Sequence, residues 1–200
     1  LPMLATIVCT VAWWALVARA SIALGDGAPP EKLPHLLLSY NHAEQAAACR
    51  WIVARPDRCG DERDSIQRVL GDCMDAALVR APIRWCGPLP SPALGDLAEA
   101  WLALSSDAID ARTARCLLEH ERADMRQRGV AWMKDNGNVL PMRERADLVG
   151  RLWDTDAAVA RAAAEALAAW GIEGLVALPC LRLLQRTTTG VVSEACGKAA

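Results

Sequence analysis

The sequence predicts an all-α protein, built as a short right-handed α-solenoid in which helix pairs stack in a row. Phe is absent and Tyr occurs once, so the chain is poor in residues that favour strands. No stretch sustains the polar and apolar alternation of a half-buried strand. An internal similarity at helical-repeat spacing, described below, predicts the stacking. The 200 residues are enough to bury a core, and the net charge of -2 gives no electrostatic reason to expect nucleic acid binding.

The N-terminal segment LPMLATIVCTVAWWALVA, residues 1–18, carries no charge and is followed by Arg19. At about 1.5 Å per residue, a helix of this length spans roughly 27 Å, close to the hydrocarbon thickness of a bilayer. Ala18 and Ala20 also fit a small-x-small cleavage site. We therefore expect residues 1–20 to be a signal peptide or a membrane anchor, two alternatives that stay open. Either one places the folded domain in the cell envelope, outside the cytoplasm.

Eight cysteines are many for a reducing compartment. Cys9 lies in the apolar leader, and the others form no C-x-x-C pair of the kind that binds zinc. We therefore expect at least one disulfide, with buried thiols acting as small hydrophobic residues as the alternative. Cys180 and Cys196 each lie eight residues from Thr188, so a helical hairpin places them opposite each other. They are the possible disulfide that we favour.

Residues 21–34 are expected to be a linker, because GDGAPPEKLP is rich in Gly and Pro. Residues 35–200 are expected to form one helical repeat domain, with a kink near 87–92 where prolines cluster. The predicted helices are 35–40, 43–54, 62–80, 93–104, 107–119, 122–134, 141–152, 156–170, 174–186 and 190–198.

Three segments align without a gap, LSYNHAEQAAACRWIV (38–53), LEHERADMRQRGVAWM (118–133) and LWDTDAAVARAAAEAL (152–167). The last two are offset by 34 residues, a helical-repeat period, and the first two by 80, about two periods. One column holds a leucine in every copy and another holds a small residue, which lets neighbouring helices approach closely. These residues are Leu38, Leu118 and Leu152 in the first column, and Cys49, Gly129 and Ala163 in the second. DAALVR (75–80) echoes DAAVAR (156–161) and suggests a degenerate copy in between.

The alanine-rich helix of the last copy is expected to bury a seam at i, i+4, i+8 and i+11. The seam residues are Val159, Ala163, Leu167 and Trp170. Asp154, Thr155 or Asp156 is expected to cap the helix by accepting its free amide hydrogens. Gly171 is expected to end it in a left-handed conformation.

The stretch DTDAAVARAAAEALAAWGIEGLVALPCLRLL, residues 154–184, resembles a bacterial HEAT-like repeat of the type also seen in phycobilisome lyases. The family pattern is an Asp-rich turn, a Val-Arg pair, an alanine-rich second helix, a Gly and the next first helix. Arg161 departs from it by standing two places after Val159, whereas Arg126 directly follows its apolar neighbour. The resemblance is fair over residues 104–200 and weak before residue 90. It implies an armadillo-like solenoid whose curved surface binds proteins.

Histidines and charged segments are the places to look for chemistry. His35 lies at a helix start, and the turns containing His42 and His120 are interpreted as solvated and polar. RADMRQR (122–128) is interpreted as a solvated helix face. The spacing of His42 and Cys49 allows a thiol nucleophile, but the column of small residues favours Cys49 as core. Because no nucleophile, phosphate-loop, metal or haem motif appears, we expect no catalytic residue, metal or cofactor.

These expectations favour a scaffold that binds an unidentified protein partner and that is exported, or tethered to a membrane through residues 1–18. An accessory enzyme similar to a lyase is one alternative. The outward-facing sensor end of a larger receptor or kinase is another.

Overall fold

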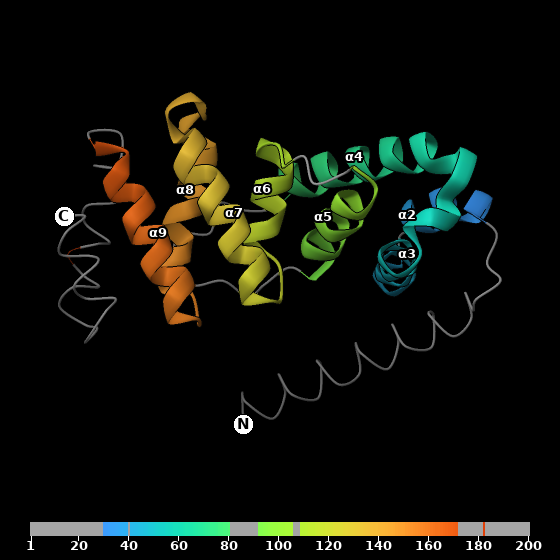
Figure 1. Cartoon of the computed structure of the whole chain (residues 1–200), viewed down its shortest axis with the longest axis horizontal. Helices are drawn as coiled ribbons and strands as arrows, with labels where there is room; N and C mark the ends of the chain where they lie inside the picture. The colour runs from blue at the N-terminus through green and yellow to red at the C-terminus, as the bar shows by residue number, and fades with distance from the viewer. Residues whose placement is uncertain (1–29, 40, 81–91, 106–108, 172–181, 183–200) are drawn as a thin grey trace, which may run out of the picture. The chain divides into compact units, whose positions relative to one another are not determined.

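The computed structural model describes residues 30–39, 41–80, 92–105, 109–171 and 182. Within these ranges every regular element is a helix and none is a strand, which confirms the all-α prediction for this part of the chain. The elements are η1 (Pro30–Lys32), α2 (Leu33–Leu37), α3 (His42–Ala54), η2 (Pro56–Glu62), α4 (Arg63–Arg80), α5 (Pro92–Leu104), α6 (Ala111–Leu118), α7 (Ala123–Asn136), η3 (Gly137–Val139), α8 (Met142–Gly150), η4 (Arg151–Trp153) and α9 (Ala157–Ala169) (Figure 1).

The chain divides into two compact units. The first comprises residues 1–76 and 96–108, and the second comprises residues 77–95 and 109–200. In the first unit α2 packs against α3, and η1 packs against η2. In the second unit α6 packs against α7, α7 packs against α9, and α8 contacts both α7 and α9.

Several sequence predictions lie outside the described residues. They include the apolar leader 1–20, almost all of the kink region 87–92, and nearly all of the last two predicted helices. Cys180 and Cys196 also lie there. Among the residues that are described, no helix combines the length and the apolar character needed to cross a membrane.

The predicted linker 21–34 extends too far toward the C-terminus. Pro30–Lys32 form η1, and α2 begins at Leu33, whose side chain is fully buried. Pro34 lies in the first turn of α2, where the amide hydrogen that proline lacks has no partner within the helix in any case. Pro30 and Pro34, two of the prolines that predicted a linker, therefore lie at the starts of helical elements instead.

Six of the predicted helices begin within one residue of the observed start, whether or not a side chain caps them. α3 and α4 begin within one residue of their predicted ranges. α6 begins at Ala111 rather than near residue 107, because the Asp110 carboxylate accepts the Thr113 amide at 2.7 Å and fixes the start there.

Helix α9 forms as its sequence indicates. Asp156 is the N-cap, and its carboxylate accepts the amides of Ala158 at 2.9 Å and Val159 at 3.1 Å. Gly171 has φ +55°, the left-handed conformation expected just after the helix. Both ends of this helix are therefore determined by local sequence.

The segment DAALVR, residues 75–80, does not begin a further copy of the repeated segment. Asp75 lies in the interior of α4, whereas Asp156 precedes α9 and caps it. The two segments share letters, but they occupy different places in their helices.

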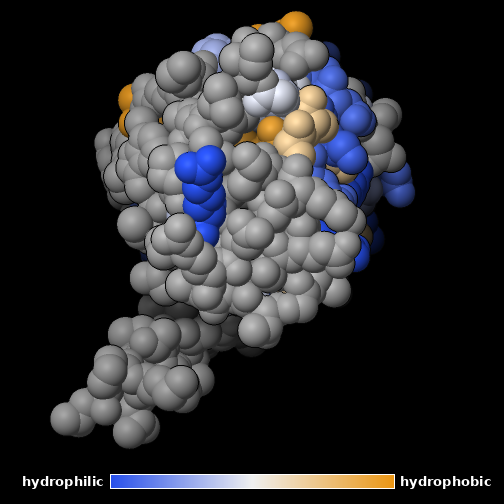
Figure 2. Space-filling model, turned by 90° about the vertical axis from the view of Figure 1, so that its left-hand side faces the viewer, coloured by the Kyte–Doolittle hydropathy of each residue, from blue (hydrophilic) through white to orange (hydrophobic). Residues whose placement is uncertain are grey.

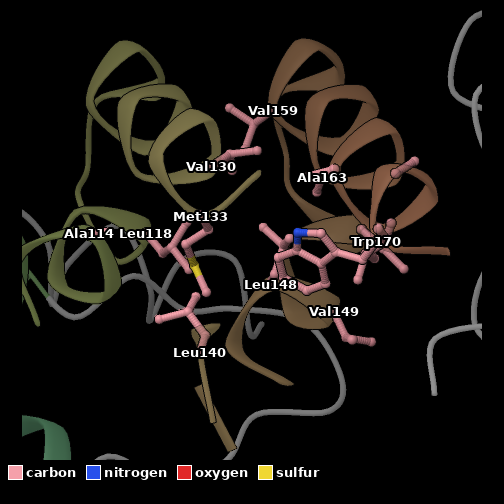
Figure 3. Close-up of a cluster of buried hydrophobic side chains, with 14 residues drawn as sticks. Ala114, Leu118, Val130, Met133, Leu140, Leu148, Val149, Val159, Ala163 and Trp170 are labelled. Carbon is pink, nitrogen blue, oxygen red and sulfur yellow. The ribbon is translucent and has the colours of Figure 1, made fainter. Parts of the chain in front are cut away.

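One large apolar core lies in the second unit, between α6, α7, α8 and α9. Figure 3 shows Val130 of α7 and Val159 of α9 next to each other, with the indole of Trp170 near the end of α9. The core residues are Ala114, Leu118, Val130, Met133, Leu140, Leu148, Val149, Leu152, Val159, Ala163, Ala164, Ala166, Leu167 and Trp170. The core residues that belong to α9 include several alanines, and these small side chains allow α9 to lie close to α7.

Candidate interaction face and the contacts that hold it

The predicted packing residues of the second unit are all buried. They are Leu118, Gly129, Leu152, Val159, Ala163 and Leu167. In the first unit Cys49 is also fully buried, but Leu38 is 58 % exposed and its neighbour Leu37 is completely buried. The prediction that Leu38 packs in the core is therefore wrong, since α2 turns Leu37 toward α3 instead.

A one-residue shift brings the first segment into register with the other two. Leu37, Leu118 and Leu152 are all buried, and the first offset is then 81 instead of 80. The apolar residue that closes the segment becomes Ile52, which is fully buried, rather than the half-buried Val53. The gapless sequence alignment missed this shift because Ala46 to Cys49 are small and buried without interruption, so neighbouring registers look equally good.

The shifted register also aligns a hydrogen bond in the turns that precede α3, α7 and α9. In all three turns a side chain accepts the backbone amide two residues further on. The acceptors are Ser39 Oγ (from Asn41, 3.1 Å), His120 Nδ1 (from Arg122, 2.9 Å) and Asp154 Oδ1 (from Asp156, 2.9 Å). Three different residue types make the same contact, so residue identity alone could not reveal the match.

The structure corrects the interpretation of His120 as part of a solvated turn. Its side chain is 4 % exposed and therefore not solvated, whereas the next two residues of the turn, Glu121 and Arg122, are exposed. A Cβ added to Gly95 would lie 2.7 Å from the Cα of His120, which shows how closely the start of α5 approaches this turn. The ring therefore has a structural part in the turn.

Gly129 explains the column of small residues. A Cβ at this position would lie 2.8 Å from the carbonyl oxygen of Ala114 and 3.2 Å from the Cβ of Leu117. Real Cβ atoms do not approach a backbone oxygen so closely. Helices α6 and α7 therefore touch here, backbone against backbone, and any side chain would separate them.

Arg126 was expected on a solvated face and is in fact buried. Its guanidinium donates two hydrogen bonds to the Asp154 carboxylate, at 2.9 Å from Nε and 2.8 Å from Nη2. Its Nη1 also donates to the backbone oxygens of His120 and Glu121, at 2.8 Å and 2.7 Å. The Arg126 and Asp154 side chains are only 6 % and 1 % exposed. A bidentate pair of this kind joins the start of α7 to the turn before α9.

Two further arginines join elements of the second unit. The buried Arg151 donates to the backbone oxygen of Leu118 at 2.8 Å and to Glu119 at 2.9 Å, linking η4 to the end of α6. Arg115 of α6 donates to Asp147 of α8 at 2.7 Å. No pattern in the sequence pointed to these two arginines. For Arg126 a signal existed, because the HEAT-like pattern places an arginine directly after the apolar residue.

Cys49 and His42 do not form a nucleophilic pair. His42 is exposed, and Cys49 is fully buried in the interior of α3. Burial raises the pKa of the Cys49 thiol well above its usual range, and the nearby Asp96 carboxylate raises it further. A thiol of this kind is a core residue. Cys49, Cys59, Cys73 and Cys116 are all present as thiols and not as disulfides.

The outward sides of α7 and α9 carry matched exposed residues. Under the offset of 34, Asp124 corresponds to Ala158, Ala131 to Glu165, and Asp135 to Ala169. We call this surface the α7–α9 face, and it comprises Asp124, Arg128, Ala131, Asp135, Ala158, Arg161, Glu165 and Ala169. Arg161 and Glu165 form an exposed ion pair at 3.8 Å. The face mixes both charges with alanines.

The rest of the described surface offers few other candidates for a binding site. In the view of Figure 2 the coloured residues are mostly hydrophilic, with smaller hydrophobic groups between them. The large exposed apolar side chains, Leu38, Val79 and Val139, belong to three different elements or turns. Among the described residues, no three His, Cys, Asp or Glu side chains are grouped so that they could hold a metal ion. No protein-family model, curated protein or solved structure matches the chain.

Proposed function

We propose that this chain is a short α-solenoid of HEAT-like helix pairs that binds a partner protein through the α7–α9 face. In the same proposal the module is exported or held at a membrane by residues 1–18, in the cell envelope. Its action is binding, with no cofactor.

The observation that carries this proposal is the repeated turn before α3, α7 and α9. The same side chain to amide hydrogen bond recurs at Ser39, His120 and Asp154, at offsets of 81 and 34 residues. After this turn α7 and α9 bury the same positions and present corresponding residues outward, whereas Ala43 and Ala47 of α3, at the positions of Asp124 and Arg128, are buried. A row of such helices supports an extended binding surface.

The contacts beneath the face favour binding by a rigid surface. Arg126 and Asp154 tie the start of α7 to the turn before α9, and Val130 and Val159 pack between the two helices. A surface whose helices are fixed in this way loses little conformational entropy when a partner binds. The alanines on the face leave room for larger side chains of the partner.

Site-specific photocrosslinking tests the proposal. A photoreactive benzophenone amino acid replaces Ala131 on α7 or Ala158 on α9, and the full chain is crosslinked in its native cell envelope. Because both positions are exposed on the same face, each is expected to give an adduct with the same protein. A matched control carries the benzophenone at Val139, which is 81 % exposed but lies outside the α7–α9 face.

Charge reversal sharpens the test. Arg128→Glu combined with Arg161→Glu is expected to reduce the adduct from Ala131 severalfold while leaving the helix content by circular dichroism unchanged. Equal adducts from Val139 and the face, or adducts that survive charge reversal at full yield, would place the binding surface elsewhere. Turnover of a small molecule by the purified chain would contradict the binding role.

A further inference from the structure

The end of α7 carries an Asn-Gly pair, in which Asn136 is followed by Gly137. In such a pair the backbone nitrogen of the glycine can attack the side-chain carbonyl carbon of the asparagine, because glycine has no side chain to obstruct the approach. The chain has two other asparagines, and they are followed by His42 and Val139, whose side chains obstruct the same attack. Asn136 is therefore the asparagine whose sequence most favours ring closure.

The folded structure holds this pair in a geometry that prevents the ring from closing. The Asn136 Nδ2 donates to the Trp132 backbone oxygen at 2.9 Å, which directs the side chain back along α7. At Asn136 ψ is 6°, so the Gly137 nitrogen eclipses the Asn136 nitrogen and is rotated away from the asparagine side chain. The attacking nitrogen and the side-chain carbonyl carbon are therefore kept apart while the last turn of α7 is intact.

Trp170 fixes the same place from the end of α9. A Cβ built on Gly137 would overlap the indole of Trp170, so the indole lies directly against the glycine backbone. The indole Nε1 also donates to the Lys134 backbone oxygen at 3.3 Å. Trp170 is 6 % exposed, and Gly137 is buried as well. The backbone at Gly137 can rotate toward the attacking geometry only after this indole has moved.

We infer that Asn136 is a deamidation site that the contact between Trp170 and Gly137 protects in the folded protein. The asparagine reacts with water, through a cyclic intermediate, when the ends of α7 and α9 separate. The ammonia that is released is lost to solvent, so the converted residue remains as a record of past openings. This assignment is independent of the partner proposed for the α7–α9 face.

The reaction has two steps. The Gly137 backbone nitrogen attacks Cγ of Asn136, a new C–N bond forms, and Nδ2 takes up the amide proton and leaves as ammonia. The product is a five-membered succinimide. Water then adds to one of the two ring carbonyl carbons, and the C–N bond of that carbonyl breaks. The result is aspartate or isoaspartate, and the balance is one water consumed for one ammonia released.

The product alters the end of α7. An aspartate at this position has no amide to donate to the Trp132 oxygen. It also places a negative charge beside the exposed Asp135 at the C-terminal end of the helix, where the helix dipole disfavours it. Isoaspartate adds a methylene group to the backbone just before Gly137. We therefore expect conversion to weaken the contact between Trp170 and Gly137.

Peptide mapping of the full chain tests the site. The chain is incubated at mildly alkaline pH, either folded in buffer or unfolded in guanidinium chloride, and is then digested with trypsin. Cleavage after Lys134 and Arg143 yields peptide 135–143, which contains both Asn136 and Asn138. In the unfolded chain Asn136 is expected to give two separable products, each heavier by the difference between OH and NH2. In the folded chain its rate is expected to be lower by about tenfold or more, because the end of α7 must first open.

Matched substitutions test the protection. Trp170→Phe removes the indole N–H and part of the ring that covers Gly137. It is expected to speed conversion of Asn136 severalfold in the folded chain and to leave the rate in guanidinium chloride unchanged. The control Trp153→Phe makes the same change in η4, near the opposite end of α7, and is expected to leave both rates unchanged.

A second pair of variants tests the consequence of conversion. N136D reproduces the charge of the product, and N136Q keeps a neutral amide. N136D is expected to show a lower melting temperature than N136Q and faster amide exchange in the last turn of α7. Equal exchange in the two variants would contradict the expected weakening of this turn.

Three results would overturn the inference. One is a folded chain that converts Asn136 as fast as the unfolded chain does. Another is faster conversion of Asn138 or Asn41 than of Asn136 in guanidinium chloride. The third is a rate in folded Trp170→Phe that does not exceed the rate in folded Trp153→Phe. If Trp170→Phe fails to fold, the comparison of the folded and unfolded unaltered chain decides the matter.

Discussion

The α2/α3 pair of the first unit and the α6/α7 pair of the second unit bury corresponding positions, but different groups hold their turns. Gln45 of α3 corresponds to Arg126 of α7 at the offset of 81. Gln45 donates a neutral hydrogen bond to the Leu37 oxygen, whereas Arg126 donates to two backbone oxygens and to a buried carboxylate. The same helix geometry is therefore held by an amide in one unit and by an ion pair in the other.

This difference indicates which contacts determine how the two helices pack and which determine how strongly a substitution lowers stability. The apolar columns are common to both pairs, so they determine where the second helix lies against the first. A neutral hydrogen bond contributes about 0.5–1.5 kcal/mol to stability. Removing one partner of a buried ion pair costs about 3–5 kcal/mol, because the remaining charge stays buried. We therefore expect the second unit to respond far more strongly to a change in its polar contacts.

The largest effect is expected for Asp154→Ala. This change removes the carboxylate from the buried Arg126, and we expect the free energy of unfolding to fall by about 3–5 kcal/mol in urea denaturation. The double variant R126M/D154L removes both charges of this pair and is expected to recover only part of that loss, because Asp154 also accepts the Asp156 amide and pairs with the buried Arg151 at 3.7 Å. The matched control is D124A, which breaks an exposed pair with Arg122 and is expected to cost about 0.5 kcal/mol or less. Similar losses in D154A and D124A would mean that the buried pair contributes no more to stability than the exposed pair.

The second largest losses of stability are expected for two opposite substitutions, glycine to alanine and alanine to glycine, at the corresponding positions Gly129 and Ala48. Gly129→Ala places a Cβ against the Ala114 oxygen, and the overpacking of about 1–3 kcal/mol exceeds the gain of about 1 kcal/mol in helix propensity. Ala48→Gly in α3 loses about 1 kcal/mol of helix propensity at a fully buried site. Thermal unfolding followed by circular dichroism measures both. A rise in the melting temperature of Gly129→Ala would show that α6 and α7 do not touch at Gly129.

A smaller loss is expected for Gln45→Met. The flexible Met side chain keeps most of the volume and removes the hydrogen bond to the Leu37 oxygen, so we expect a loss of about 0.5–1.5 kcal/mol in urea denaturation. Amide hydrogen exchange at the start of α3 is expected to quicken, while exchange in α7 stays unchanged. A loss as large as that of D154A would remove the contrast between the two pairs.

The smallest effect is expected for Glu165→Ala on the exposed side of α9. Its ion pair with Arg161 spans one helical turn and is open to solvent, so we expect a loss of about 0.2–0.5 kcal/mol that disappears at high salt. Denaturation in low and high salt measures it. A loss that persists in high salt would mean that Glu165 makes a contact beyond this pair.

The sequence indicated much of the second unit correctly because its signals are local. Asp156 and Gly171 bound α9 through contacts within a few residues, and the apolar spacing marked the buried side of the helix. The repeat offset of 34 between Leu118 and Leu152 also corresponds to equivalent burial. Such features depend on backbone propensity and helical period, which a single sequence contains.

The register of the first segment could not be obtained in this way. A run of four small residues from Ala46 to Cys49 fits the buried column in more than one register, and the choice between Leu37 and Leu38 depends on how α2 packs against α3. A one-residue ambiguity of this kind is decided by packing and not by composition.

By itself, the sequence determined that the described chain is helical, where its best-marked helices begin and end, and which side of α9 is apolar. Only the tertiary structure decided which partners Arg126, His120 and Asp154 have. The physical reason is that a charged or polar side chain is stable inside a protein only beside a specific partner. In the case of Arg126 that partner lies 28 residues away and is brought close only when α7 and α9 pack together.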